Sequence, residues 1–213
     1  MKKLIIFILF LLPFPVLSAE ILGQDVFIEK GIFYTKAGQR YSGTLRFYSG
    51  EMLKSEGTYV NGVKEGVEKY YNDDGKLREE ITFINNLRDG PARMYYESGE
   101  LHAEYTNVKG DQHGLMKWYH KNGNLYAEET FVKNVMEGPA KSYYESGELM
   151  AEFFHRDFFI EGTMTVYKKD GNLWGKMVYK KDEVVSGACA NGRAFTQREI
   201  LKWNVSKYGV ECE

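Results

Sequence analysis

Cysteine and proline are scarce in this chain of 213 residues, which contains only Cys189, Cys212 and four prolines. The two cysteines have neither the C-x-x-C spacing nor the adjacent histidine that is typical of a redox or zinc pair. In an oxidising compartment, an isolated even pair is most simply a disulfide. We therefore predict a bond between Cys189 and Cys212, and a redox or metal pair is the alternative.

A surplus of positive charge is also absent. Removing Lys2 and Lys3 from the 28 Lys and Arg residues leaves 26 against 30 Asp and Glu, a formal charge of −4. Binding to phosphate groups draws on clustered Lys and Arg, so this balance argues against a nucleic acid partner. It argues equally against a general attraction to anionic lipid.

Catalytic signatures are missing as well. The sequence has no Gly-x-Ser-x-Gly elbow, no P-loop and no dinucleotide-binding fingerprint. Its four histidines are not at metal-ligand spacing to one another or to a cysteine. We predict no catalytic residues, no metal site and no cofactor, and therefore a protein that is not an enzyme.

The first nineteen residues resemble an export signal rather than part of a fold. Lys2 and Lys3 precede an apolar run over residues 4–12, and the small residues Ser18 and Ala19 follow. This order is that of a cleavable signal peptide, and the run is short for a transmembrane helix. We predict a signal peptide at 1–19 and a periplasmic or secreted protein, since no cysteine follows the cleavage site. An uncleaved N-terminal anchor is the alternative.

One motif, Gly-x-x-x-x-Tyr-x-x-x-Gly-x-Leu, recurs every 24 residues. Its five strict copies begin at Gly66, Gly90, Gly114, Gly138 and Gly162, and a looser copy begins at Gly43. Periods of 20 to 50 residues indicate stacked supersecondary units. We predict an array of six repeats over 43–186, preceded by capping strands within 20–42 and followed by a C-terminal cap at 187–213.

Each repeat contains two turn signals. The first is a Gly-containing pair, at Asp74-Gly75, Ser98-Gly99, Asn122-Gly123, Ser146-Gly147 and Asp170-Gly171. Such pairs favour type I′ turns, which join antiparallel strands. The second signal, as at Asn85-Asn86 and Lys133-Asn134, joins each repeat to the next. The chain is therefore predicted to be all-β, an elongated antiparallel β-meander of tandem two-stranded hairpins.

The predicted turns fix a register that places opposite charges across from each other. The pairs are Lys69 with Glu80, Arg93 with Glu104, Lys117 with Glu128, and Lys141 with Glu152. The same face carries a tyrosine ladder, Tyr71, Tyr95, Tyr119, Tyr143 and Tyr167. The opposite face is predicted to carry the motif leucines, at positions 77, 101, 125, 149 and 173, with small residues such as Ala103, Ala127 and Ala151.

These ladders have both structural and functional interpretations. Regular Lys and Glu pairs are typical of a solvated stripe that prevents register slips. Stacked tyrosines bury area in a sheet with little interior, and the alternative is a platform that binds sugars, peptides or lipid headgroups. Tyr95, Tyr119 and Tyr143 are therefore candidate partner-binding residues.

The two ends of the chain carry further signals. Alternation of apolar and polar residues over Val26–Tyr34 predicts one or two capping strands. Thr196 and Glu199 form a capping box that begins a short helix from about Gln197 to Trp203, with Phe195 and Ile200 as a hydrophobic staple. We expect Ile200, Leu201 and Trp203 to pack over the end of the sheet.

The fifth strict copy is preceded by an unusual segment. Residues 153–160 replace the usual polar turn with aromatic residues, namely Phe153, Phe154, Phe158 and Phe159. These phenylalanines either form an exposed patch for a partner or pack under the C-terminal cap.

The repeats at 114–125 and 138–149 resemble the bacterial MORN-repeat variant family, and the likeness covers about residues 43–186. This resemblance implies a hairpin array with a scaffolding, protein-binding or membrane-associated role, and some members are labelled antitoxins. We predict an exported, non-catalytic scaffold that mediates protein–protein interaction with an unidentified partner. The alternatives are a module that binds an envelope glycan or a membrane surface, and an immunity or antitoxin-like protein that acts outside the cytoplasm.

Overall fold

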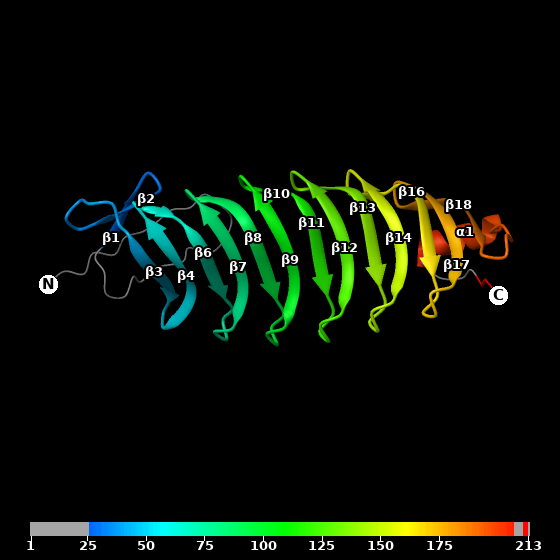
Figure 1. Ribbon diagram of the computed structural model, residues 1–213, viewed down its shortest axis with the longest axis horizontal. Coiled ribbons are helices and arrows are strands. Elements are labelled where there is room, and N and C mark those ends of the chain that lie inside the picture. Colours follow the sequence, from blue (N-terminus) through cyan, green and yellow to red (C-terminus); the bar gives the residue numbers. More distant parts are fainter. Residues whose placement is uncertain (1–25, 207–210, 213) are drawn as a thin grey trace. The chain divides into compact units, whose positions relative to one another are not determined.

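The computed structural model describes residues 26–206 and 211–212, so the predicted signal peptide lies outside the described residues. The described residues form two compact units, one of residues 26–100 and 107–110 and one of residues 101–106, 111–206 and 211–212. In each unit, consecutive strands lie next to each other in an antiparallel sheet (Figure 1). The predicted antiparallel β-meander of hairpins is confirmed.

The first unit contains a two-stranded hairpin and the first part of the meander. The hairpin pairs β1 with β2, and the meander follows the order β3-β4-β6-β7-β8, with short β5 paired to β4. The bounds are β1 Val26–Glu29, β2 Ile32–Thr35, β3 Gly43–Ser49, β4 Met52–Val60, β5 Val63–Lys64, β6 Gly66–Tyr71, β7 Leu77–Ile84 and β8 Leu87–Tyr95.

The second unit continues the same pattern and ends in a helix. Its order is β9-β11-β12-β13-β14-β16-β17-β18, with short β10 paired to β9 and short β15 paired to β14, and the last two residues of β9 belong to the first unit. The bounds are β9 Leu101–Val108, β10 Asp111–Gln112, β11 Gly114–Tyr119, β12 Leu125–Val132, β13 Val135–Tyr143, β14 Leu149–Arg156, β15 Phe159–Ile160, β16 Gly162–Tyr167, β17 Leu173–Lys180, β18 Glu183–Cys189 and α1 Gln197–Ser206. No helix among the described residues is long and apolar enough to cross a membrane.

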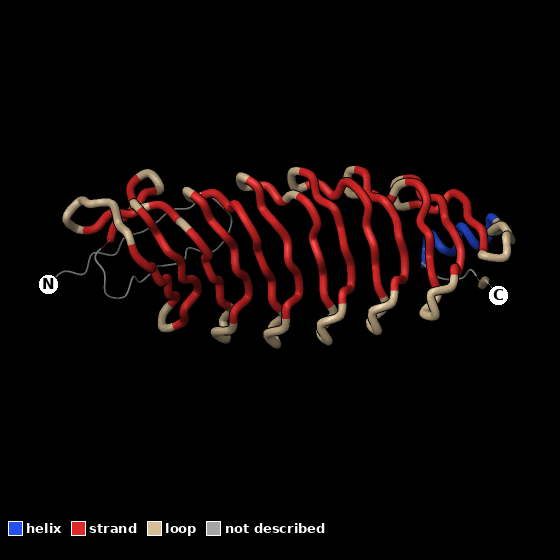
Figure 2. The backbone as a smooth tube through the Cα atoms, viewed as in Figure 1, coloured by secondary structure: helices blue, strands red, loops and turns tan. Residues whose placement is uncertain are grey.

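Turns of two kinds join consecutive strands, one kind at each end of the strands (Figure 2). At one end of the strands, turn pairs such as Asn85-Asn86 and Lys133-Asn134 have positive φ at both residues, between 50° and 68°, which is the type I′ geometry. At the other end of the strands, only the glycine of each turn has a positive φ, as at Gly75 with 78°. There Gly75 donates to Asn72 O at 3.0 Å and Asn72 donates to Lys76 O at 2.8 Å.

The predicted type I′ turns at the glycine pairs are therefore wrong. The hydrogen bonds at Asn72–Lys76 enclose a three-residue loop, a type I turn followed by a left-handed glycine. Such a loop adds one residue to the hairpin, and a bulge follows between Tyr70 and Tyr71. Register shifts at the same place show that the hairpins β11–β12, β13–β14 and β16–β17 are built this way, whereas Ser49 pairs with Met52 around a two-residue loop between β3 and β4.

The bulge changes which face the leucines occupy. Beyond it the predicted register is confirmed, with Lys117 opposite Glu128 and corresponding pairs at Lys69–Glu80 and Lys141–Glu152. Nearer the turn, Tyr119 pairs directly with Leu125. Directly opposed residues share a face, so the prediction of an opposite leucine face is wrong. We call the side with the tyrosines, the leucines and the charge pairs the tyrosine face.

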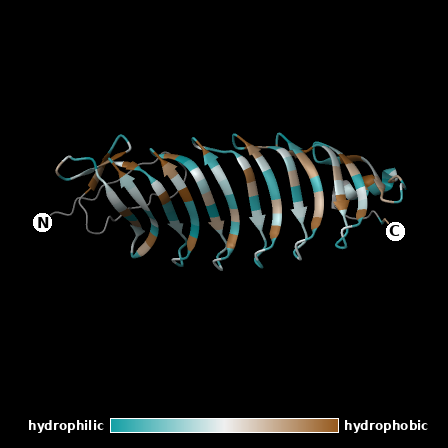
Figure 3. Cartoon of the chain, viewed as in Figure 1, coloured by the Kyte–Doolittle hydropathy of each residue, from teal (hydrophilic) through white to brown (hydrophobic). Residues whose placement is uncertain are grey.

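The opposite face holds the buried residues and packs against a cap in each unit. In the first unit, Phe33 and Tyr41 bury Leu45 and Tyr59, which are each 1% exposed. The Phe33 and Tyr59 rings meet edge to face at 4.8 Å. This hairpin confirms the capping strands predicted near Val26–Tyr34. Along the strands, apolar residues alternate with hydrophilic ones (Figure 3).

In the second unit the cap is α1. Phe195 and Ile200 are buried with Met177 and Val184, and Trp203 donates from Nε1 to the Tyr179 hydroxyl at 3.1 Å. The predicted staple and helix are therefore confirmed, whereas the expected burial of Leu201 is wrong: this residue points outward and is 59% exposed.

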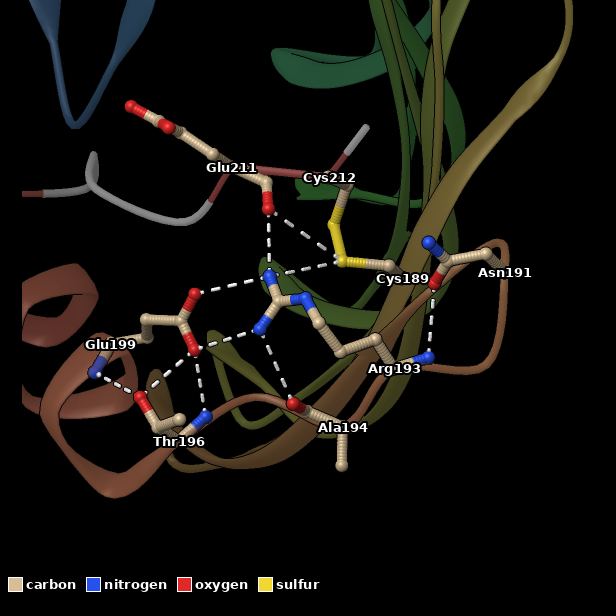
Figure 4. A network of polar contacts seen from close by, with 8 residues as sticks. All are labelled: Cys189, Asn191, Arg193, Ala194, Thr196, Glu199, Glu211 and Cys212. Carbon is tan, nitrogen blue, oxygen red and sulfur yellow. Dashed lines mark hydrogen bonds and ion pairs between the residues drawn. A yellow bond between two sulfur atoms is a disulfide. The ribbon is translucent and has the colours of Figure 1, made fainter.

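A polar network holds the start of this helix (Figure 4). Glu199 accepts from the Thr196 N–H at 2.7 Å, and the Glu199 N–H donates to Thr196 Oγ1 at 3.3 Å, which is the predicted capping box. Arg193 donates two bonds to the Glu199 carboxylate and one to Glu211 O at 2.6 Å. The disulfide joins Cys189 to Cys212, so Cys212 is tied to the end of β18.

Candidate interaction surface

A row of alternating charges runs across the tyrosine face of each unit. In the first unit the paired order is Arg46, Glu56, Lys69, Glu80 and Arg93. In the second unit it is Glu104, Lys117, Glu128, Lys141 and Glu152. Along each run, neighbouring charges are therefore of opposite sign, which favours one strand register.

The tyrosine ladder is bonded to this row. Each motif tyrosine donates its hydroxyl to the glutamate fifteen residues earlier, at 2.7 to 2.9 Å: Tyr71 to Glu56, Tyr95 to Glu80, Tyr119 to Glu104, Tyr143 to Glu128 and Tyr167 to Glu152. Glu152 also pairs with Lys141 at 3.1 Å. The hydroxyls thus serve the fold by fixing the carboxylates.

This arrangement raises the pKa of the tyrosines and lowers the pKa of Glu152. Desolvation, followed by the bond to Glu104, raises the pKa of Tyr119 to about 12. Desolvation and the bond to Glu128 do the same to the pKa of Tyr143. The bonds from Lys141 and Tyr167 lower the pKa of Glu152. Glu152 therefore stays charged at neutral pH, and Tyr119 and Tyr143 stay neutral, which is a structural state rather than one poised for acid–base catalysis.

In each unit, exposed apolar residues that were not predicted lie beside the charge row, and we call them the apolar strip. Val60, Ile84, Val108 and Val132 follow each other at the repeat period and are 42–45% exposed. Each lies four residues after a glutamate of the row on the same strand, so strand alternation places it on the tyrosine face. A 24-residue period in apolar positions outside the motif was the signal that identifies them.

The strip changes in the last two repeats. Arg156 and Lys180 occupy the position that holds valine or isoleucine in the earlier repeats. Phe154 and Val178 occupy the position that holds threonine in the earlier repeats. Phe154 and Val178 are 37% and 38% exposed. Cations and apolar side chains therefore replace the neutral strip at this end of the second unit.

These substitutions surround a shallow hollow of about 560 Å³. Phe154, Arg156, Thr163, Val178, Lys180 and Val185 contribute to its lining. We call it the Phe154 hollow. Phe159 is paired with Arg156 across β14 and β15, and it is 42% exposed. Apolar walls and two cations meet here on one face.

Phe158 lies at the turn next to this hollow in a conformation that phenylalanine rarely adopts. Its φ is 71°, in the left-handed region where a Cβ crowds the backbone. The equivalent positions of other repeats hold Asn86, Gly110, Asn134 and Asp182. Phe158 is nevertheless 53% exposed, so burial of the ring does not explain it.

The residue also omits a hydrogen bond that its counterparts make. Asn86 Oδ1 accepts from the Lys64 N–H at 2.7 Å, Asn134 Oδ1 from Gln112 at 2.7 Å, and Asp182 Oδ1 from Ile160 at 2.6 Å. Each bond ties one repeat to the turn of the next. Phe158 keeps only the backbone bond to Met136 O at 3.1 Å, because its side chain has no acceptor.

The structure places the four predicted phenylalanines differently. Phe154, Phe158 and Phe159 are exposed and are not members of the buried cluster under α1. Phe153 pairs with Ala140 on the opposite face and contacts the His155 ring at 5.2 Å. Three of the four therefore share one accessible region, which we call the aromatic surface: Phe154, Phe158 and Phe159.

Among the described residues, no group of three or more His, Cys, Asp or Glu side chains is placed to hold a metal ion.

The family model for the MORN repeat variant matches five consecutive segments, at residues 64–85, 88–107, 112–133, 136–157 and 160–181. The chain belongs to the MORN repeat variant family.

The matched MORN segments correspond to the five strict copies of the motif. The looser copy at Gly43 is not matched, yet β3 and β4 form a similar hairpin with a shorter loop, in which Tyr48 lies opposite Leu53 after a bulge. The structure therefore contains one more hairpin of the MORN type than the five matched segments.

Other comparisons add little. No curated protein matches the chain significantly. Among solved structures, the chain is similar to a GtfA/B complex bound to UDP and GlcNAc, with 12% identity, a TM-score of 0.25 and coverage of 67% of this chain and 25% of that one. A second GtfA/B complex has 8% identity, a TM-score of 0.20 and coverage of 65% and 21%. The chain thus spans about a quarter of the length of the first matched chain.

Proposed function

We propose that this MORN repeat protein is an exported, non-catalytic scaffold that binds another protein through the aromatic surface. MORN repeats generally mediate interactions with proteins or membranes, and the aromatic surface is where this chain departs from its own repeat. The observation that carries the proposal is Phe158, an exposed aromatic residue in a left-handed turn position.

Backbone strain at an exposed position supports a role other than stability. An asparagine at residue 158 would tolerate the left-handed φ and would supply the missing acceptor for Met136. The exposed ring instead adds an apolar side chain beside Phe159 and Phe154, and aromatic residues are enriched at the centres of protein interfaces. The aromatic surface is therefore the part of the protein at which we expect a partner.

The tyrosine ladder supports this choice because its hydroxyls are already bonded to glutamates. Tyr95, Tyr119 and Tyr143 consequently offer a glycan few free polar atoms. Binding of an envelope glycan or of lipid remains a prediction, which co-sedimentation with peptidoglycan or vesicles tests.

A quantitative capture experiment tests the proposal. The tagged chain, purified after export, is incubated with envelope extract, and bound proteins are quantified for the parent and for the double variant Phe158→Asn, Phe159→Ser. We expect the variant to lose one specific protein while its thermal unfolding is at least as stable as that of the parent. Leu115→Ser is the matched control, since Leu115 is also exposed, at 47%, on the tyrosine face.

Two results would contradict the proposal. Undiminished capture by the double variant removes the aromatic surface from consideration. Equal losses for the double variant and for Leu115→Ser assign the binding to exposed apolar residues of the tyrosine face in general.

Export is tested separately by the mass of the mature protein. Cleavage after residue 19 and recovery from the periplasm or medium are the expected results. A full-length protein that stays with the inner membrane would instead indicate the uncleaved anchor.

A further inference from the structure

The Phe154 hollow has a composition that selects for one kind of ligand. Its apolar lining comes from Phe154, Val178 and Val185, which are 37%, 38% and 50% exposed. Arg156 on β14 and Lys180 on β17 occupy the same position in consecutive repeats, and both also line the hollow. The hollow is thus an apolar floor with two cations at one side.

These cations are not committed to the charge row. Throughout the row, glutamates lie opposite Lys or Arg, as in the Lys141–Glu152 ion pair at 3.1 Å. Arg156 is instead paired with Phe159, and Lys180 with Glu183. Neither Arg156 nor Lys180 makes an ion pair with another residue in the described part of the chain. Both therefore keep donors that a ligand can use.

Glu161, the acidic residue of the lining, is already engaged. Its Oε2 accepts from the Lys181 N–H at 3.0 Å, as Glu137 Oε2 accepts from the Asp157 N–H at 3.1 Å one repeat earlier. The carboxylate thus has a structural bond to the type I′ turn, whereas Arg156 and Lys180 contribute the cations of the lining.

We propose that the Phe154 hollow binds an extended segment of the partner protein in which a large apolar side chain is flanked by carboxylates. The apolar side chain lies on Phe154 and Val178, and the carboxylates accept hydrogen bonds from Arg156 and Lys180. This proposal rests on the proposed function and adds the chemistry of the partner. Charge complementarity selects this occupant, because a basic or purely apolar segment would leave both cations desolvated without a partner.

The hollow adjoins the aromatic surface at Phe154 and at Phe159. Phe154 belongs to both, and Phe159 is the strand partner of Arg156. A segment that enters the hollow would therefore continue over Phe159 toward the Phe158 turn. The strained phenylalanine then acts as the outer wall of the same binding region.

The experiment uses a displayed library of random heptapeptides selected on the immobilised full chain. Enriched peptides are synthesised, and their binding to the parent and to the double variant Arg156→Glu, Lys180→Glu is measured by fluorescence anisotropy at two salt concentrations. The control is Arg78→Glu, Arg198→Glu, two exposed cations whose reversal gives the same net charge change.

We expect enriched peptides to carry a large apolar residue within two positions of Asp or Glu. Binding should fall by about tenfold or more in the Arg156→Glu, Lys180→Glu variant, since a single charge-assisted hydrogen bond contributes roughly that factor. Higher salt should weaken binding to the parent, and the control variant should bind like the parent.

Three outcomes overturn the proposal. These are enriched peptides without acidic residues, peptides that bind the charge-reversed variant as well as the parent, and a selection that enriches no peptide. Sedimentation with phosphatidylglycerol vesicles that is lost in the charge-reversed variant would assign the site to lipid. If Phe158→Asn, Phe159→Ser still abolishes partner capture in these cases, the proposed function stands and only the ligand chemistry of the hollow is wrong.

Discussion

Replacing Phe158 by asparagine should make this protein more stable. The left-handed conformation costs an ordinary L-residue about 1–2 kcal/mol, and asparagine tolerates it with much less strain. A bond from the Met136 N–H to the new side-chain oxygen, like the 2.7 Å bond between Lys64 and Asn86, adds about 1 kcal/mol. Phe158 is 53% exposed, so loss of its partial burial removes about 1 kcal/mol.

The net effect is a stabilisation of about 1 kcal/mol, which corresponds to a rise in melting temperature of roughly 3 °C for a chain of this size. Thermal and urea unfolding followed by circular dichroism measure it. Hydrogen exchange should also slow at the Met136 amide, because this amide gains an acceptor in the variant.

The converse substitution is the matched control. Asn86 has a φ of 67°, its N–H donates to Lys64 O at 3.1 Å, and its side chain accepts from the Lys64 N–H. Asn86→Phe reproduces the Phe158 turn in the first unit, so it should lose about 1 kcal/mol through strain and the missing bond. A Phe158→Asn variant less stable than the parent, together with a neutral Asn86→Phe, would refute the reasoning from strain.

Three further predictions concern the ladder and the C-terminal cap. Tyr119→Phe removes the 2.7 Å bond to Glu104 and should cost about 1 kcal/mol in urea unfolding; an unchanged midpoint would show that water replaces the hydroxyl. The bond from Arg193, with those from Thr196, lowers the pKa of Glu199 to about 2 from 4.5, so this carboxylate contributes stability above its unfolded pKa that is lost as pH falls from about 4.5 to 2. Near-ultraviolet circular dichroism of the cap tryptophans should report this loss, and Glu199→Gln should abolish the pH dependence in that range. Cys212→Ser should lower stability by about 3 kcal/mol in the chain-entropy model, and a chemical denaturation curve that matches the parent would contradict a stabilising disulfide.

The sequence predicts the hairpin array because equivalent residues repeat at a fixed interval. Its charge pairs also predict the register beyond the bulge, as the pair Lys117–Glu128 shows. The capping box at Thr196 and Glu199 could also be predicted, since it requires only two residue types at a fixed spacing.

The positions of the leucines could not be predicted in the same way. A glycine after a polar residue fits either a type I′ turn or a type I turn with a left-handed glycine, and only the second adds a residue and a bulge. The choice moves Leu125 to the face of Tyr119. Likewise, Val60 and Ile84 lie outside the glycine, tyrosine and leucine motif, so that motif does not predict the exposed apolar strip.

The alternation of charges in the row restricts how such a protein can change length. Lys117 lies between Glu104 and Glu128, and Glu128 lies between Lys117 and Lys141. Duplication of a whole 24-residue repeat inserts one cation and one anion, so every residue of the row keeps neighbours of opposite sign. Duplication of a single strand would instead put like charges side by side, which destabilises pairing. Evolution can therefore lengthen or shorten this array only in steps of one hairpin.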